Sequence, residues 1–226
     1  MKKLIEGVLR FQREIYPRDR ELYEGLASSQ SPRWLLITCS DSRVVPSVLA
    51  QAGPGELFIC RNAGNIVPAH GEHSGGVAAT IEYAVQVLGV KHVIVCGHSD
   101  CGAMKAVLHP ERLNELPAVA RWLAYAARAR AVVAPAAANG ASESELLDAL
   151  TAENVLAQLD NLRTLPSVAA KLRVGALELH GWLYDIRRGN FRFWDPDGDK
   201  WRPIEDLADE PRAAANEAPA QEVARA

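Results

Sequence analysis

Two cysteines and one histidine stand in polar segments directly after apolar runs of the sequence. Cys39 follows the run 34 to 38, and His98 and Cys101 follow the run 92 to 96. Thiolate sulfur and imidazole nitrogen are ligands that Zn²⁺ prefers, and the His98-x2-Cys101 spacing lets one turn supply two of them. This short pattern is weak alone, but a cysteine at the end of another strand strengthens it. Three protein ligands leave the fourth position open, so we predict one zinc ion in a catalytic site.

Asp41 and Arg43 follow the first of these cysteines at intervals of two residues. Asp41 could complete the tetrahedron around the metal or stand beside it as a hydrogen-bond acceptor. Arg43 could pair with Asp41 and hold its carboxylate off the metal. A solvated ion pair in a loop is the ordinary interpretation of this spacing, but the closeness to Cys39 favours a role at the metal.

The other two cysteines, Cys60 and Cys96, lie inside apolar runs, where a small buried hydrophobic residue is the ordinary interpretation. Charged residues such as Glu6 and Arg10 interrupt the N-terminal stretch that a secretory signal would need to be apolar. Four cysteines without such a signal favour metal or catalytic use over a disulfide framework. We therefore expect a cytoplasmic protein.

The elements that must position these residues form an alternating pattern. Short apolar runs typical of strands cover 34 to 38, 56 to 60, 92 to 96, 174 to 179 and 190 to 194. Helical periodicity separates several of them, at 75 to 88, 116 to 133 and 142 to 164, and the segment 135 to 140 is expected to break the helical region. This alternation predicts the α/β class, with a mostly parallel β-sheet of about five strands and helices on both faces. The last strand is expected at an antiparallel edge, because the segment 183 to 189 before it is too short for a crossover helix.

The chain divides into three predicted parts. Residues 1–30 carry amphipathic helical patterns and form an N-terminal helical arm, and residues 31–207 form the zinc-binding α/β catalytic domain. Residues 208–226, rich in Ala, Glu, Pro and Arg without periodicity, form a flexible C-terminal tail.

Composition excludes two classes of partner. The net charge is −3 and no cluster of Lys and Arg stands out, so we expect no nucleic-acid partner. The apolar runs are strand-sized and far shorter than the roughly 20 residues that cross a bilayer, so we expect no membrane span. With 48% hydrophobic and 23% charged residues, the chain has the composition of a globular protein.

These segments together resemble the β-class carbonic anhydrases, in the plant-type subclass with bacterial members. The resemblance extends over roughly residues 4 to 200, and it is carried by Cys39-x-Asp41-x-Arg43, 61 to 65, His98-x2-Cys101, 153 to 155 and 180 to 185. It implies a carbonic anhydrase, or carbonate dehydratase, which is a lyase. In such an enzyme zinc-bound hydroxide attacks carbon dioxide and reversibly gives bicarbonate and a proton. It also implies a homo-oligomer, at least a dimer, with a tetramer or an octamer left open.

The resemblance also assigns roles to residues. Cys39, His98 and Cys101 would hold one zinc ion per subunit, and Asp41 would accept a hydrogen bond from the hydroxide, with Arg43 as its partner. The substrate site would include Gln30, Val44, Phe58, Tyr83 and Gly102, the last of which opens the helix after the metal ligands. Part of this pocket would come from a neighbouring subunit. Residues 2 to 15 would wrap over that subunit, although packing against their own domain stays open.

Two positions depart from relatives within the family. Leu36 stands where some members carry a tryptophan of an inhibitory bicarbonate site, so we predict a zinc that is open to water and not closed by Asp41. Val87 stands where some members carry a histidine that shuttles protons. His70 or His73 could substitute for it, or both could be ordinary surface histidines. Two thiolates cancel the charge of zinc, so the activity is expected to rise on the alkaline side.

Three other interpretations compete with this one. A zinc-organised binding or scaffold module would need no pair of Asp41 and Arg43. A hydrolase of a carbon dioxide analogue such as carbon disulfide could use the same fold. A thiol redox enzyme would use Cys39 and Cys101 directly and would hold no zinc.

Overall fold

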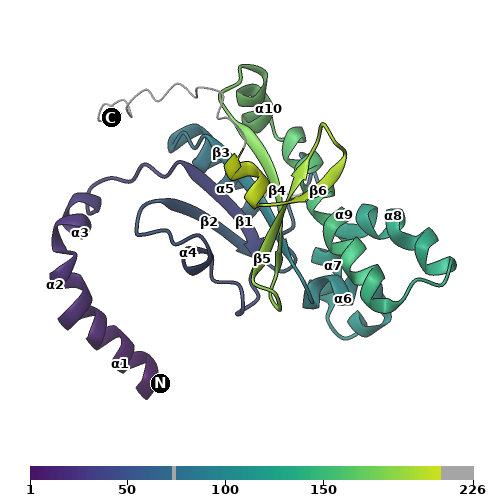
Figure 1. Cartoon of the computed structure of the whole chain (residues 1–226), viewed down its shortest axis with the longest axis horizontal. Helices are drawn as coiled ribbons and strands as arrows, with labels where there is room; N and C mark the ends of the chain where they lie inside the picture. The colour runs from purple at the N-terminus through teal and green to yellow at the C-terminus, as the bar shows by residue number, and fades with distance from the viewer. Residues whose placement is uncertain (73–74, 210–226) are drawn as a thin grey trace.

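A computed structural model describes residues 1–72 and 75–209 of the chain (Figure 1). Its centre is a six-stranded sheet with the spatial order β2-β1-β3-β4-β5-β6. The first four strands in this order pair in parallel, and the last two are antiparallel. The strands are β1 (Trp34–Cys39), β2 (Leu57–Asn62), β3 (His92–His98), β4 (Glu178–Asp185), β5 (Asn190–Asp195) and β6 (Lys200–Pro203). The predicted α/β class and the mostly parallel sheet with an antiparallel edge are confirmed.

The sheet differs from the prediction at two places. β4 begins at Glu178, whereas the apolar run predicted a strand from residue 174. Gly175, with φ of 64°, turns the chain into β4, so Val174 is 71% exposed at that turn. β6 is a sixth strand that we did not predict, because two of its four residues are charged and it therefore contains no apolar run.

Helices precede, connect and cover these strands. They are α1 (Lys2–Arg10), η1 (Phe11–Ile15), α2 (Tyr16–Arg18), α3 (Arg20–Leu26), α4 (Pro46–Leu49), α5 (Gly76–Glu82), η2 (Tyr83–Val87), α6 (Gly102–Leu108), η3 (Pro110–Leu113), α7 (Pro117–Leu123), η4 (Ala124–Ala126), α8 (Ala127–Ala138), α9 (Glu143–Thr164), α10 (Pro166–Arg173) and α11 (Glu205–Asp209). The break that we predicted from residue 135 occurs only after Ala138. Pro135 lies in the last turn of α8, where its missing N–H removes only one helical hydrogen bond. α9 begins with a capping box in which Ser142 and Glu145 satisfy each other's amides.

The largest apolar cluster lies between one face of the sheet and the helices α5, η2, α9 and α10. Val93 and Val95 of β3 belong to it, together with Val155 and Leu159 of α9. α9 lies so close to β3 that a Cβ on Gly97 would stand 2.9 Å from Val155 Cγ2. A smaller cluster on the other face contains, in the described residues, side chains of β1, β3, β4 and β5 only.

The N-terminal helices α1 to α3 extend away from the sheet as an arm (Figure 1). None of their residues is buried, and apolar side chains such as Leu4 and Val8 are 70% and 59% exposed. Residues 208 and 209 of the predicted tail belong to α11, and 210–226 lie outside the described residues. Among the described helices, none combines the length and the apolar character that crossing a membrane requires.

Candidate metal centre

The three predicted metal ligands meet at the carboxyl end of two neighbouring strands. Cys39 is the last residue of β1 and His98 the last of β3, and these strands pair in parallel. Asp100 then adopts a left-handed conformation, with φ of 58°, and Cys101 follows it at the start of α6. Asp is one of the few residues that enter this region readily. The tight turn therefore brings Cys101 back toward the strand ends.

The spacing of the three ligand atoms fits a tetrahedral zinc ion. The two sulfur atoms lie 3.9 Å apart, and the three ligand atoms lie within 4.8 Å of one another. Zinc with Zn–S bonds of about 2.3 Å would place two thiolate sulfurs about 3.8 Å apart. All three residues are buried, with at most 5% of any of them exposed.

His98 presents an unprotonated nitrogen to this cluster. Its Nδ1 lies 2.9 Å from the carbonyl oxygen of Ser99, which can only accept, so Nδ1 carries the proton. The Nε2 atom is buried and has no hydrogen-bond partner among the residues that the structure describes. A buried nitrogen lone pair with no donor costs free energy unless a ligand binds it, so this atom fits a metal ion.

The two sulfurs share a proton that a divalent cation would replace. Hydrogen bonds from the Cys101 thiol and from the Gly64 amide lower the pKa of Cys39 to about 4. The bond to the Cys39 sulfur, together with burial, raises the pKa of Cys101 above its usual range. The backbone amides of Met104 and Ala103 in α6 oppose this rise in the pKa of Cys101. The pair is thus set up to bind a cation with release of that proton.

Cys60 and Cys96 are buried in apolar clusters, as expected. Burial raises the pKa of the Cys96 thiol to about 12 and that of Cys60 above its usual value. Both remain protonated near neutral pH and serve as small apolar residues.

Asp41 and Arg43 form a bidentate pair beside the metal cluster. Arg43 Nε and Nη2 donate to the two carboxylate oxygens of Asp41 over 3.0 and 2.8 Å. These hydrogen bonds hold the pKa of Asp41 well below its usual range, so the carboxylate is ionised near neutral pH. Asp41 Oδ2 lies 3.8 Å from His98 Nε2. The carboxylate therefore stands next to the cluster while the guanidinium holds it.

Two hydrogen bonds of Arg43, both to Asp100, were not predicted from the sequence. Arg43 Nη1 donates to Asp100 Oδ2 over 3.0 Å, and Nη2 donates to the Asp100 carbonyl over 3.1 Å. Lys105 of α6 also pairs with the Asp100 carboxylate. The position of Asp100 between His98 and Cys101 was visible in the sequence, but its contact across 57 residues to Arg43 was not.

Polar side chains of α9 form hydrogen bonds with the loop after β2, and these contacts were not predicted from the sequence. Asn154 Nδ2 donates to the Gly64 carbonyl over 2.9 Å, and Gln158 Oε1 accepts from the Val67 amide over 2.8 Å. Gln158 Nε2 in turn donates to Asn154 Oδ1 over 3.0 Å. Gly64 has φ of 81°, and a Cβ there would lie 3.0 Å from Met104 Cε. Asn154 and Gln158 are polar residues four apart within an apolar helical stripe, and this spacing is the sequence feature that could have predicted their contacts.

The five predicted substrate-site residues occupy different surroundings. Val44 is buried, and the rings of Phe58 and Tyr83 lie side by side with centroids 6.0 Å apart. Tyr83 is 45% exposed, and Gln30 is exposed in the segment between α3 and β1. Gly102 is the first residue of α6, with open space where a Cβ would be. The structure thus brings Phe58 and Tyr83 together on the surface of one chain.

The remaining predicted positions have simpler surroundings. His70 is exposed, and its backbone amide donates to Thr164 Oγ1 over 2.8 Å. His73 lies outside the described residues. Leu36 belongs to the small strand-only cluster on the second face of the sheet.

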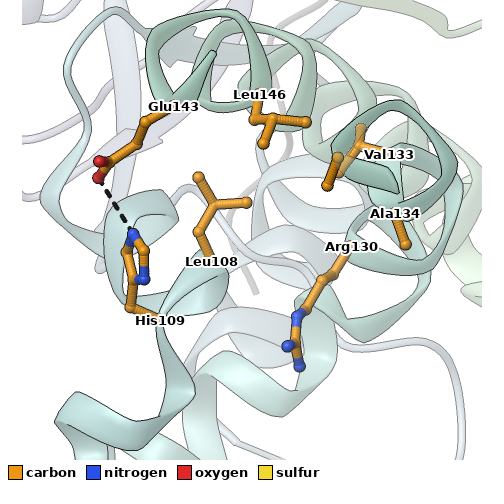
Figure 2. A pocket seen from close by; sticks show the side chains of 8 residues that line it. Leu108, His109, Arg130, Val133, Ala134, Glu143 and Leu146 are labelled. Atoms are coloured by element: carbon orange, nitrogen blue, oxygen red, sulfur yellow. Dashed lines mark hydrogen bonds and ion pairs between the residues drawn. The ribbon is translucent and has the colours of Figure 1, made fainter. Parts of the chain in front are cut away.

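A cavity of about 290 Å³ lies between α6, α8 and α9 (Figure 2). Apolar side chains such as Leu108 and Leu146 line it together with His109, whose Nε2 is 3.0 Å from Glu143 Oε1. None of the residues predicted for the metal or substrate site lines this cavity.

Comparison with known proteins adds an independent observation. A family model described as carbonic anhydrase matches residues 34–191. A carbonic anhydrase of Pseudomonas aeruginosa is 57% identical over 84% of this chain and 85% of its own. The structure of the β-carbonic anhydrase CcaA superposes with a TM-score of 0.87 at 41% identity, over 90% of this chain and 91% of that one. One of the tetrameric β-carbonic anhydrases of Sordaria macrospora gives a TM-score of 0.78 at 29% identity, over 85% of this chain and 95% of that one.

Proposed function

The chain belongs to the β-carbonic anhydrase family and is a carbonic anhydrase, and from this premise we propose that it hydrates carbon dioxide reversibly with one zinc ion bound by Cys39, His98 and Cys101. The observation that carries the proposal is the buried, orphaned Nε2 of His98 beside two sulfurs 3.9 Å apart. Two thiolates and an imidazole are a donor set that zinc prefers, and they leave one position open.

The residues around the cluster have separate tasks in this proposal. When bound, zinc would supply the Lewis-acid chemistry that makes water a nucleophile near neutral pH. Asp41 Oδ2 would accept a hydrogen bond from the attacking group and orient its lone pair toward carbon dioxide. Arg43 would keep Asp41 ionised and off the open position, because it bonds both carboxylate oxygens. The 2.9 Å bond from His98 Nδ1 to the Ser99 carbonyl would fix the ring orientation that ligation needs.

We propose that two chains complete the substrate pocket. Gln30, Phe58 and Tyr83 would reach the metal site of a neighbouring chain, while Val44 and Gly102 would lie beside the metal of their own chain. The exposure of Tyr83 and Gln30 on the single chain supports this arrangement. The arm α1 to α3 would wrap over the neighbour, which its exposed apolar residues also support.

A reducing compartment such as the cytoplasm suits this site. Two sulfurs 3.9 Å apart would be prone to form a disulfide in an oxidising compartment, whereas none of the four cysteines is in a disulfide here. We therefore propose a cytoplasmic location.

The proposal is tested by stopped-flow hydration of carbon dioxide with zinc quantified in the same samples. We expect Cys39→Ala to lose both zinc and activity, because two ligands rarely retain the metal. Cys60→Ala is the matched control, since it removes another buried thiol outside the cluster, and it should keep both. Equal rates in wild type and Cys39→Ala would contradict the assignment of Cys39.

A further inference from the structure

A second group of potential metal ligands lies at the opposite end of β3 and β4. It consists of His92, Glu178 and His180. His92 and Glu178 are register partners at the start of the two strands, and His180 lies two residues further along β4. β3 spans seven residues, so this group is about 20 Å from the His98 end of the strand. It is separate from the site proposed for catalysis.

The three candidate ligand atoms form a nearly regular triangle. His92 Nδ1 lies 3.2 Å from His180 Nε2 and 3.4 Å from Glu178 Oε2, and His180 Nε2 lies 3.6 Å from the same oxygen. Tetrahedral zinc with bonds of about 2.0 to 2.1 Å spaces its nitrogen and oxygen ligands about 3.4 Å apart. An octahedral ion at the same bond length would need about 3.0 Å between neighbouring ligands. The triangle therefore fits tetrahedral coordination without movement of the backbone.

The chemistry of the group also suits a cation. Glu178 supplies one negative charge. The side chains of His92, His180 and Glu178 are 27%, 33% and 66% exposed, so an ion can reach them from solvent. Two imidazoles and a carboxylate favour zinc over calcium or magnesium, which prefer oxygen ligands.

We propose that His92, Glu178 and His180 form a second, non-catalytic zinc site that joins the amino-terminal ends of β3 and β4. Water would complete the coordination on the exposed side. The bound ion would link two strands at the centre of the sheet and would stabilise the folded chain increasingly as the free Zn²⁺ concentration rises above the dissociation constant.

The test is a calorimetric titration of the full-length, zinc-loaded protein with further Zn²⁺. We expect wild type to bind one additional equivalent per chain. Glu178→Gln keeps the size of an exposed side chain and should fold normally, yet it should weaken the additional site at least about tenfold. His180→Ala should abolish it. The matched control is His109→Ala, which removes another histidine paired with a carboxylate, and it should leave the additional equivalent unchanged.

Cobalt distinguishes the two sites by their ligands. Co²⁺ added to the zinc-loaded protein should give visible bands without the near-ultraviolet sulfur-to-cobalt bands that Cys39 or Cys101 would produce. The proposal is overturned if wild type takes up no further equivalent, if Glu178→Gln and His180→Ala retain it, or if the added cobalt shows sulfur ligation. None of these readouts depends on the hydration activity, so failure here would leave the proposed catalytic site untouched.

Discussion

Arg43 is the side chain that connects the carboxylate of Asp41 to the turn between His98 and Cys101. It contacts both Asp41 oxygens as well as the side chain and carbonyl of Asp100. Its removal would release Asp41 toward His98 Nε2, which is only 3.8 Å away. We therefore regard Arg43 as a positioning residue whose effect is exerted through Asp41.

We predict that Arg43→Ala lowers kcat/KM for hydration by about 100-fold, because a freed Asp41 no longer orients the attacking group. Zinc content should remain at one equivalent in the catalytic site, since Arg43 is not a ligand. Arg43→Lys should restore little of the lost kcat/KM, because an ammonium group cannot make the bidentate contact with Asp41. Stopped-flow rates and metal analysis of the same samples check this.

Arg128→Ala is the matched control for this prediction. It removes a surface arginine that pairs with Asp160 over 2.8 Å and lies outside the metal site. Its rate should equal that of wild type. Loss of zinc in Arg43→Ala would show that Arg43 holds the fold of the site and would refute the positioning role.

At the scale of residues, the sequence predicted which side chains could bind a metal. It did not predict which other residues contact them. Cys39, His98 and Cys101 stood out because thiols and an imidazole followed apolar runs at predictable strand ends. The contact of Arg43 with Asp100 depends on the left-handed turn at Asp100, which no local pattern of apolar residues reveals. The orphaned Nε2 of His98 likewise depends on the tertiary structure.

At the scale of elements, α9 supports the metal site indirectly, because its side chains form hydrogen bonds with the loop after β2. Gln158 is fully buried, and its side chain bonds both the Val67 amide and Asn154 Oδ1. We predict that Gln158→Leu lowers the free energy of unfolding by about 3 kcal/mol, because a buried amide and a buried carbonyl lose their partners. Urea unfolding measures this.

Gln86→Leu makes the same substitution on an exposed position of η2 and serves as control. Its effect should stay within about 0.5 kcal/mol. If both variants unfold at the same urea concentration, the polar contacts of α9 do not stabilise the loop.

The pairing of β3 with β4 gives a prediction about pH. Burial lowers the pKa of His180 in the folded chain, next to His92 and Glu178, below the value of about 6.5 in the unfolded chain. The unfolded chain therefore binds more protons as pH falls below about 6.5, and stability is lost on the acid side. His180→Gln should lose less stability than wild type between pH 7 and pH 5, measured by thermal unfolding without added zinc. Equal losses in the two proteins would refute this.

Strand and helix boundaries were predictable where apolar periodicity was strong. β1, β3 and α9 begin and end close to the predicted residues because each buries a continuous apolar face. β4 began later than predicted because Val174 is apolar in sequence but lies at an exposed turn. β6 pairs with β5, and its Trp201 packs against the main apolar cluster, but one tryptophan between two charged residues makes no apolar run that would predict a strand.

At the scale of the whole molecule, the arm α1 to α3 is the feature that a single chain leaves unexplained. Apolar side chains recur along one side of α1 and η1, including Leu4, Val8 and Phe11, and they stay 36% to 70% exposed. A helix with an exposed apolar stripe gains stability by packing against another surface. We propose that the apolar stripe of the arm packs against a neighbouring chain.

We predict that the double substitution Leu4→Glu and Val8→Glu shifts the protein toward the monomer in sedimentation velocity, because two charges would be placed against an apolar surface. Hydration activity should fall with the oligomer, since Gln30, Phe58 and Tyr83 would no longer reach a second metal site. The double substitution Lys3→Gln and Arg10→Gln changes the net charge by the same amount on the opposite side of the helix, and it should retain both oligomer and activity. A wild-type oligomer that persists with Glu at residues 4 and 8 would refute the wrapping.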